Sequence, residues 1–144
     1  GVVVIDDQGR VLLLNHVFHP YIPWDVPGGW LNRNEDPAAG ALRELWEETG
    51  IIAELGPVVR LKHEEYPAHL GIAFLAFANP QPMVLSNEII EARWFAPDAL
   101  PEKLVPFTRA AIETAVYTYQ TQFVSNPSPL KKSRVGEEEV SHHE

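Results

Sequence analysis

Short hydrophobic runs, separated by turn residues, recur along the chain and predict β-strands. Val2 to Ile5 and Val11 to Leu14 are aliphatic at consecutive positions, and Asp6-Asp7-Gln8-Gly9 joins them, which predicts a β-hairpin. Because neither run alternates with polar residues, we expect both faces of these strands to be covered, as when helices flank a sheet.

The strand pattern is less regular after residue 50. Ile51 to Ala53 and Val58 to Lys62 predict two strand pieces, with a turn at Gly56-Pro57 between them. His63 to Leu70 is polar and is interrupted by a proline, so we expect irregular structure there. Two further strands are predicted by apolar runs over Gly71 to Ala78 and Ile89 to Phe95.

Two segments have helical spacing. The first should begin at Asp36-Pro37, where an acceptor side chain at the N-cap precedes a proline at the first helical position. It should end at Gly50, which can adopt the left-handed conformation that closes a helix. The second is expected from Thr108 to Phe123, with Pro106 close to its start. This order of strands and helices indicates an α/β fold.

Three carboxylates lie on one side of the first predicted helix, because Glu44, Glu47 and Glu48 stand at i, i+3 and i+4. Like charges one turn apart destabilise a helix by about 0.2–0.5 kcal/mol per pair, so we expect a cation against them. Oxygen ligands favour a hard divalent ion, Mg²⁺ or Mn²⁺. Taken alone, the same three residues would also fit a solvated acidic helix face.

The residues around these glutamates decide between the two interpretations. Gly29 is followed after five residues by Glu35, and after seven more by Arg43-Glu44-Leu45-Trp46-Glu47-Glu48-Thr49-Gly50-Ile51. This stretch resembles the signature of the Nudix, or MutT-like, hydrolases at every fixed position, without a gap. The signature covers about a sixth of the chain. Val26-Pro27-Gly28 before it and EARWFAPDALP near residue 95 also resemble segments of that family.

The resemblance implies the fold in more detail. It predicts an α/β/α sandwich in which a mixed, curved sheet lies between helices, with the signature loop and helix at the mouth of the sheet. We expect this Nudix domain to occupy residues 1–124. Residues 125–144 are rich in proline, serine and charge and poor in apolar residues, which predicts a disordered tail.

The resemblance also implies an enzyme. Family members hydrolyse the diphosphate linkage of a nucleoside diphosphate joined to another group, X, by attack of water on phosphorus. By the same resemblance Glu44, Glu47 and Glu48 are metal ligands, helped by the Gly29 carbonyl. Mg²⁺ is the expected cofactor, with Mn²⁺ as a substitute.

Arg43 and Glu35 are interpreted as residues that hold these ligands in place. Arg43 can reach Glu47 one turn along the helix, and Glu35 through the preceding loop. We count Arg43 with Glu44, Glu48 and Glu88 in the catalytic set.

The general base is left open between Glu44, Glu88 and Glu91. Glu88 lies six residues before Trp94, the spacing at which MutT-like relatives place an additional metal-binding glutamate. We therefore favour Glu88 as an extra ligand or base. Glu91 is more typical of an acid on a strand face.

Substrate selection must come from residues outside the signature. Tyr21 and Trp30 are close to it in sequence and could stack on a nucleobase, whereas Trp24 is expected to pack in the core. Pro67 lies about sixteen residues beyond the signature, a placement associated in this family with ADP-ribose pyrophosphatases. ADP-ribose or a nucleotide sugar is therefore our first expectation and a nucleoside triphosphate the second.

The composition of the chain limits the kinds of binding partner that we expect. A net charge of −9 argues against a non-specific binder of nucleic acid or anionic membranes, so we expect a small nucleotide substrate instead. There is no cysteine and no apolar run long enough to span a bilayer, and nothing resembles a signal peptide, which favours a cytoplasmic protein. The sequence opens at Gly1 rather than Met, so its true start is left open. A homodimer is compatible with the family.

The resemblance leaves two other functions to consider for this chain. A Nudix fold can serve as a nucleotide sensor or interaction domain without catalysis, but such proteins generally lose signature residues and this chain has lost none. The second alternative is an isomerase that acts on an isoprenyl diphosphate, as one branch of the Nudix family does. That branch uses a catalytic cysteine, which this chain lacks.

Overall fold

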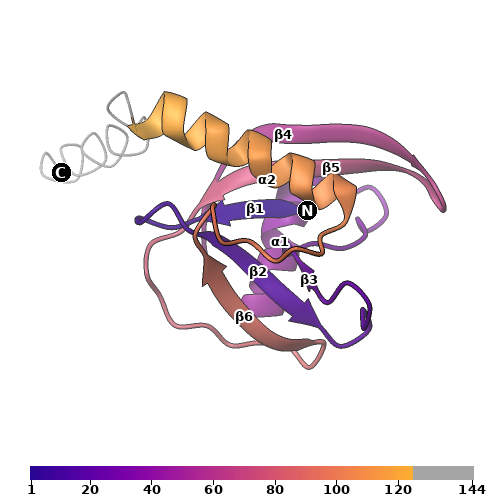
Figure 1. Cartoon of the computed structure of the whole chain (residues 1–144). Coiled ribbons are helices and arrows are strands. Elements are labelled where there is room, and N and C mark those ends of the chain that lie inside the picture. Colours follow the sequence, from indigo (N-terminus) through magenta and orange to yellow (C-terminus); the bar gives the residue numbers. More distant parts are fainter. Residues whose placement is uncertain (125–144) are drawn as a thin grey trace, which may run out of the picture.

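The computed structural model describes residues 1–124, so the tail predicted over residues 125–144 lies outside the described residues. Six strands and two α-helices form the domain, with a short π-helical segment after the second helix (Figure 1). In chain order they are β1 (Val2–Ile5), β2 (Val11–His16), β3 (Trp24–Asp25), α1 (Pro37–Thr49), β4 (Glu54–Glu65), β5 (Ala68–Phe77), β6 (Ile89–Phe95), α2 (Pro106–Thr118) and η1 (Tyr119–Val124).

The strands form one mixed sheet, as predicted. Its order is β3-β2-β1-β5-β4, and β6 pairs with β2 outside this path. The central pair, β1 and β5, is parallel, whereas the other pairs are antiparallel. β1 meets β2 only at the pair Ile5–Val11, while β3 meets it further on, at Leu14 and Asn15, and the β2–β6 ladder runs from Val11 to His16. The predicted β1–β2 hairpin is therefore correct, although its strands diverge quickly.

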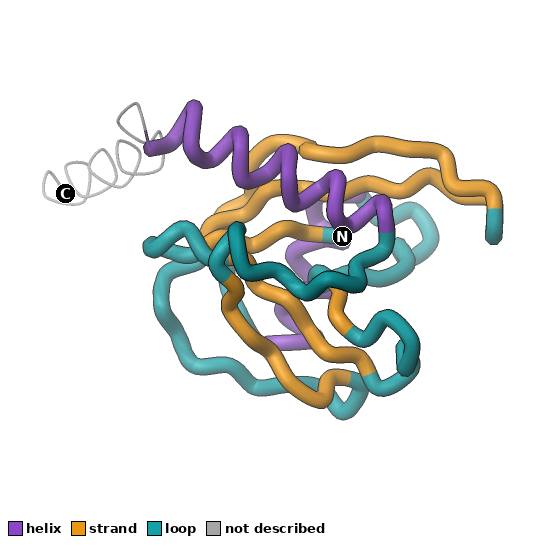
Figure 2. Tube along the Cα trace, in the orientation of Figure 1, coloured by secondary structure: helices purple, strands orange, loops and turns teal. Residues whose placement is uncertain are grey.

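The two helices cover opposite faces of the sheet (Figures 1 and 2). Alternate residues of β1 belong to different cores: Val3 and Ile5 pack with α2, while Val2 and Val4 pack with α1. All four side chains are fully buried. The prediction that both faces of these strands are covered is thus confirmed, and it explains why the run carries no polar alternation.

The ends of α1 lie where the sequence places them. The side chain of Asp36 accepts a hydrogen bond from the backbone N–H of Ala39 at 3.1 Å. Gly50 adopts the left-handed conformation, with φ of 71°, and its N–H donates to the Trp46 carbonyl at 2.8 Å. The loop before β6 donates to the same end of the helix, from Val84 N–H to the Thr49 carbonyl and from Ser86 N–H to the Glu48 carbonyl.

Two predictions about the middle of the chain are wrong. Ile51 to Ala53 is not a strand, and Gly56-Pro57 is not a turn, because β4 runs without a break through Gly56 and Pro57. The pairing with β5 shifts register between Leu55 and Val58, so the extra residues bulge. Proline cannot donate to a ladder, and a bulge on an edge strand is a position where this costs little.

The segment His63 to Leu70, predicted to be irregular, instead forms the end of a long β-hairpin. β4 continues to Glu65, the chain turns at Tyr66-Pro67, and β5 begins at Ala68. This hairpin reaches beyond the rest of the sheet (Figure 2). Side chains there are mostly exposed, so the apolar periodicity that would have predicted a strand is missing.

The helix predicted over Thr108 to Phe123 is present, with a different end. α2 begins at Pro106, and after Thr118 the chain changes to the π-helical segment η1.

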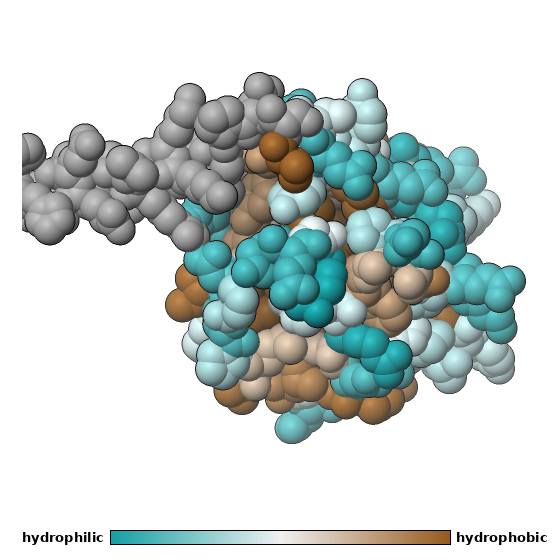
Figure 3. All heavy atoms as spheres, turned by 60° about the vertical axis from the view of Figure 1, so that its left-hand side comes forward, coloured by the Kyte–Doolittle hydropathy of each residue, from teal (hydrophilic) through white to brown (hydrophobic). Residues whose placement is uncertain are grey.

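Hydrophilic and hydrophobic residues are interspersed over the face seen in Figure 3. Among residues 1–124, no helix has the length and apolar character needed to cross a membrane.

Replacing the N-cap of α1 should destabilise the domain without changing its fold. We expect Asp36→Ala to lower the free energy of unfolding by about 1 kcal/mol, because one backbone donor loses its partner. Unfolding in urea, monitored by circular dichroism, measures this free energy. Asp36→Asn keeps the acceptor and serves as the matched control; equal losses in both variants would contradict the capping role.

Candidate active site

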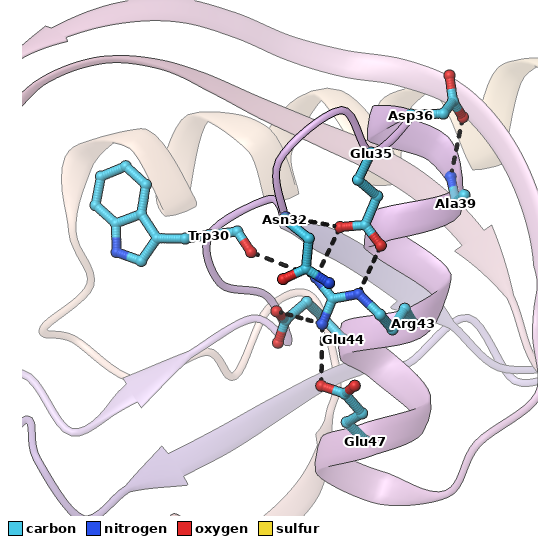
Figure 4. Close-up of polar contacts among 8 residues, drawn as sticks. All are labelled: Trp30, Asn32, Glu35, Asp36, Ala39, Arg43, Glu44 and Glu47. Carbon is cyan, nitrogen blue, oxygen red and sulfur yellow. Dashed lines mark hydrogen bonds and ion pairs between the residues drawn. The ribbon is translucent and has the colours of Figure 1, made fainter.

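The site is organised around one arginine on α1. The guanidinium of Arg43 donates to both carboxylate oxygens of Glu35, from Nε at 2.6 Å and from Nη2 at 2.8 Å (Figure 4). Its Nη1 lies 3.0 Å from Glu44 Oε1 and 3.0 Å from Glu47 Oε2. Arg43 therefore links the loop before α1 to two of the three helix carboxylates, and the predicted contacts with Glu35 and Glu47 are present.

The Arg43–Glu35 pair stays charged. Hydrogen bonds from Arg43 and from the Asn32 N–H lower the pKa of Glu35 to about 2. Glu35 in turn raises the pKa of Arg43 above its ordinary value. A bidentate guanidinium–carboxylate pair has a defined geometry as well as charge, so it fixes the loop of residues 29–35 against the helix.

Glu44 is pressed against the backbone of that loop. A Cβ atom added at Gly29 would lie 2.9 Å from Glu44 Cδ, so only glycine leaves room for the carboxylate at its present position. Burial raises the pKa of Glu44, which Arg43 opposes, and the charges of Glu48 and Glu47 raise it further. The like charges are thus close enough to affect one another.

Glu48 is held from the opposite direction. Its carboxylate is buried, and Oε1 accepts a hydrogen bond from the Gly28 N–H at 2.8 Å. Oε2 lies 3.5 Å from His16 Nε2. Burial lowers the pKa of His16, but the hydrogen bond and charge of Glu48 outweigh this, so that the pKa is raised overall. Glu48 is the most enclosed of the three signature carboxylates.

The donor chemistry fits a divalent metal ion, because three carboxylates and a nearby backbone carbonyl offer only oxygen ligands. Within residues 1–124, however, no three acidic or histidine side chains converge as a metal site. Glu44 and Glu47 face Arg43, and Glu48 faces Gly28 and His16. An ion at the signature would therefore require at least some of these carboxylates to turn.

A cleft of about 650 Å³ opens beside Glu44. One side is the loop from Gly28 to Leu31 with the first turns of α1, and another is the tip of the β4–β5 hairpin. The start of α2 contributes Val105, Phe107 and Thr108. Of the three signature glutamates, only Glu44 lines this cleft.

Aromatic rings stand at the outer wall of the cleft. Trp30 is 66% exposed, and its ring meets that of His69 edge-on at 4.9 Å between centroids. Tyr66, at the hairpin turn, is 93% exposed. Such exposed aromatic surface beside a carboxylate is suited to a ligand that has a flat apolar face.

The structure separates the predicted site residues into two groups. Trp30 and Glu44 line the cleft, but Tyr21 and Glu88 are exposed and do not. The backbone of Glu88 accepts from the Val17 N–H, next to His16, so the residue lies toward the Glu48 end of the site. Glu91 is paired with Arg93 at 2.6 Å, as expected of an acid on a strand face.

The two other tryptophans considered are structural. Trp24 packs edge-on against Phe95 at 5.2 Å, and the Arg93 guanidinium lies over its ring. Trp94 packs against the core beneath α1. Sequence reasoning missed Glu64 and Tyr66 as cleft residues, because they belong to the hairpin that was predicted to be irregular. His69 also lines the cleft; the sequence allowed it a contact with phosphate or sugar but favoured a surface position.

Comparisons with known proteins identify the family. Residues 1–115 match the model of the NUDIX domain family. An RNA pyrophosphohydrolase of Roseobacter denitrificans is 40% identical over 70 residues, which is 49% of this chain and 44% of that relative. An RNA pyrophosphohydrolase of Rhizobium meliloti is 31% identical over an alignment of 150 positions, which covers 83% of this chain and 90% of the relative.

Solved structures agree with the fold. A MutT protein from Methanosarcina mazei superposes with a TM-score of 0.66 at 26% identity, covering 84% of this chain and 92% of that one. An ADP-ribose pyrophosphatase from Streptococcus suis shares the fold, with a TM-score of 0.68 at 18% identity, covering 84% of this chain and 91% of that one. With the full signature, the helix it forms and the family match over residues 1–115, the chain belongs to the Nudix hydrolases and is a pyrophosphohydrolase.

Proposed function

We propose that this protein hydrolyses the diphosphate linkage of a nucleoside diphosphate derivative in a reaction that depends on Mg²⁺. The observation that carries the proposal is the position of Glu44. Its carboxylate lines the cleft, and the Gly29 backbone and Arg43 are packed against it. Phosphate oxygens bound in the cleft would thus lie beside the acidic end of the signature.

Glu44, Glu47, Glu48 and the Gly29 carbonyl are the groups that would hold the ion. A bound divalent ion neutralises phosphate charge and lowers the pKa of a coordinated water. Arg43 would keep Glu44 and Glu47 in place until the ion is present, and Gly28 and His16 would orient Glu48.

In the reaction a water oxygen forms a bond to one phosphorus, and the bond from that phosphorus to the bridging oxygen breaks. The bridging oxygen leaves with the other phosphate, and the water proton passes to a carboxylate base. Glu44 is supported as this base by its place in the cleft. Glu88 and Glu91 do not line the cleft, so Glu88 fits an accessory role better.

The relatives suggest a second candidate substrate. Several are RNA pyrophosphohydrolases, which makes the 5′ end of an RNA a candidate beside a free nucleotide. The net charge of −9 opposes a long polyanion but does not prevent binding of one terminal phosphate group. The alternative of a non-catalytic nucleotide sensor is disfavoured by the intact signature.

The reaction class is tested with a panel of ADP-ribose, UDP-glucose, ATP, dinucleotide polyphosphates and 5′-triphosphorylated RNA, assayed with Mg²⁺. We expect phosphate-bond cleavage that stops when EDTA is added. Glu48→Gln should remove at least about 99% of the rate at every Mg²⁺ concentration, because a ligand charge is lost. The amide oxygen can still accept from Gly28, so the unfolding temperature should change little.

Two results would contradict this proposal. Absence of cleavage across the panel would favour a sensor, and nearly full activity in Glu48→Gln would contradict its role as a ligand.

Gly29→Ala should change the active site without changing the stability of the fold. The three atoms nearest the added Cβ all belong to the flexible end of Glu44, so stability should be nearly unchanged while the carboxylate is displaced. We expect the Mg²⁺ concentration for half-maximal rate to rise by roughly tenfold, the size of effect seen when support around a metal ligand is disturbed. Titration of activity with Mg²⁺ measures this, and an unchanged curve would mean that Glu44 is not a ligand.

Glu88→Gln tests the accessory carboxylate. If Glu88 is a ligand or base, turnover should fall by about 10²-fold, in the range expected for loss of general-base catalysis. Glu91→Gln is the matched control, since that side chain is paired with Arg93 and should tolerate the change. Wild-type turnover in Glu88→Gln would remove Glu88 from the active site.

A further inference from the structure

A carboxylate that the signature does not contain also lines the cleft. Asp25 is the last residue of β3, where it pairs with Leu14 of β2, and its side chain is half-buried. Its Oδ1 accepts two hydrogen bonds, from the Val26 N–H at 2.7 Å and from the Thr108 hydroxyl at 2.6 Å. Hydrogen bonds to an ionised carboxylate are short and strong, so these two donors fix the direction of the side chain.

Thr108 reaches Asp25 because the first turn of α2 is packed tightly on the sheet. The side chain of Thr108 is only 3% exposed. A Cβ atom added at Gly71 of β5 would lie 2.8 Å from Phe107 Cε2, so the ring of Phe107 packs directly on the strand there. This packing holds the start of α2 beside the cleft, and with it the hydroxyl that donates to Asp25.

The second carboxylate oxygen of Asp25 is left available. Within residues 1–124, Oδ2 has no hydrogen bond or ion pair, and it is not one of the buried polar atoms that lack a partner. It therefore keeps contact with solvent while Oδ1 is engaged. A side chain fixed through one oxygen and open at the other is suited to accept a proton from a bound water.

Asp25 belongs to the same end of the cleft as the signature glutamates. The Gly1 amino group lines the cleft and donates to the Ile72 carbonyl at 2.7 Å. Burial lowers the pKa of this amino group, and the charges of Asp25, Glu44 and Glu48 act in the opposite direction, that of Asp25 most strongly. Because such interactions weaken with distance, the three carboxylates lie around one region of the cleft.

We infer that Asp25 accepts the proton of the attacking water, and that Thr108 positions its carboxylate for this step. The inference rests on the proposed hydrolysis and deepens it by assigning the base. The water oxygen bonds to phosphorus as one of its O–H bonds breaks, the proton bonds to Asp25 Oδ2, and the bridging oxygen leaves with the other phosphate. Glu44 keeps its role toward the ion, since a bound cation lowers the pKa of a carboxylate and weakens it as a base.

Asp25→Asn tests the proton transfer. The amide oxygen can still accept from Val26 and Thr108, so the fold should be kept while the proton acceptor is lost. ADP-ribose, UDP-glucose, ATP and 5′-triphosphorylated RNA are compared, and the one that the wild type cleaves fastest is used at saturating Mg²⁺. We expect kcat to fall by about 10²-fold or more with KM little changed. Asp98→Asn, the same change at an exposed position outside the cleft, should keep the wild-type kcat.

Two further measurements separate a base from a metal ligand. Binding of Mn²⁺, followed by electron paramagnetic resonance without substrate, should be unchanged in Asp25→Asn and weakened in Glu48→Gln. Formate, a small carboxylate, should restore part of the turnover of Asp25→Ala but none of that of Glu48→Gln.

Thr108→Val tests the positioning role independently. Loss of the hydroxyl should lower kcat by about tenfold, the size of effect expected when support around an active group is lost, without a change in KM or in Mn²⁺ binding. Thr108→Ser keeps the hydroxyl and should restore the rate. A wild-type kcat in Thr108→Val would contradict the positioning role.

Three results would overturn the assignment of Asp25 while leaving hydrolysis intact. They are a nearly wild-type kcat in Asp25→Asn, a rise in KM alone, which would indicate a substrate contact, and weakened Mn²⁺ binding, which would indicate a ligand. Absence of cleavage of every substrate by the wild type would instead overturn the proposed function and this inference with it.

Discussion

Arg43 is the cation against which the acidic end of this site is assembled. Its guanidinium holds Glu35 with two hydrogen bonds and lies 3.0 Å from both Glu44 and Glu47. Without that charge, carboxylates spaced one turn apart on α1 would repel one another and the preceding loop would lose its attachment. The same side chain therefore stabilises the helix, fixes the loop and orients two candidate ligands.

The fold provides the rigid base for this cluster. Alternate residues of β1 and β2 pack under α1 and α2, so α1 rests on a fully buried surface. Glu48 points into this supported region and is held by the Gly28 backbone. Glu44, on the adjacent turn, faces the cleft. A rigid helix thus presents one enclosed carboxylate and one that lines the cleft, and side chains on a rigid helix are placed more precisely than side chains on a loop.

Features encoded locally could be predicted from the sequence, whereas those that depend on distant pairing could not. Asp36 and Gly50 set the ends of α1 by contacts within a few residues, and the signature spacing predicted the contacts of Arg43. The turn at Gly56-Pro57 was wrongly predicted because these residues normally break a strand, and only pairing with β5 makes them a bulge. The end of the β4–β5 hairpin was missed because its side chains are mostly exposed and carry no apolar periodicity. Glu64 and Tyr66 were missed with it.

The central claim is that the acidic side of α1 is a site for a divalent ion that receives the substrate's diphosphate. Anomalous diffraction from crystals soaked in Mn²⁺ with a non-hydrolysable nucleoside diphosphate derivative tests it most directly. The account predicts a manganese peak among Glu44, Glu47 and Glu48, with Glu44 or Glu47 turned from Arg43 and the diphosphate in contact with the ion. Manganese bound elsewhere, or a diphosphate bound away from these glutamates, would contradict it.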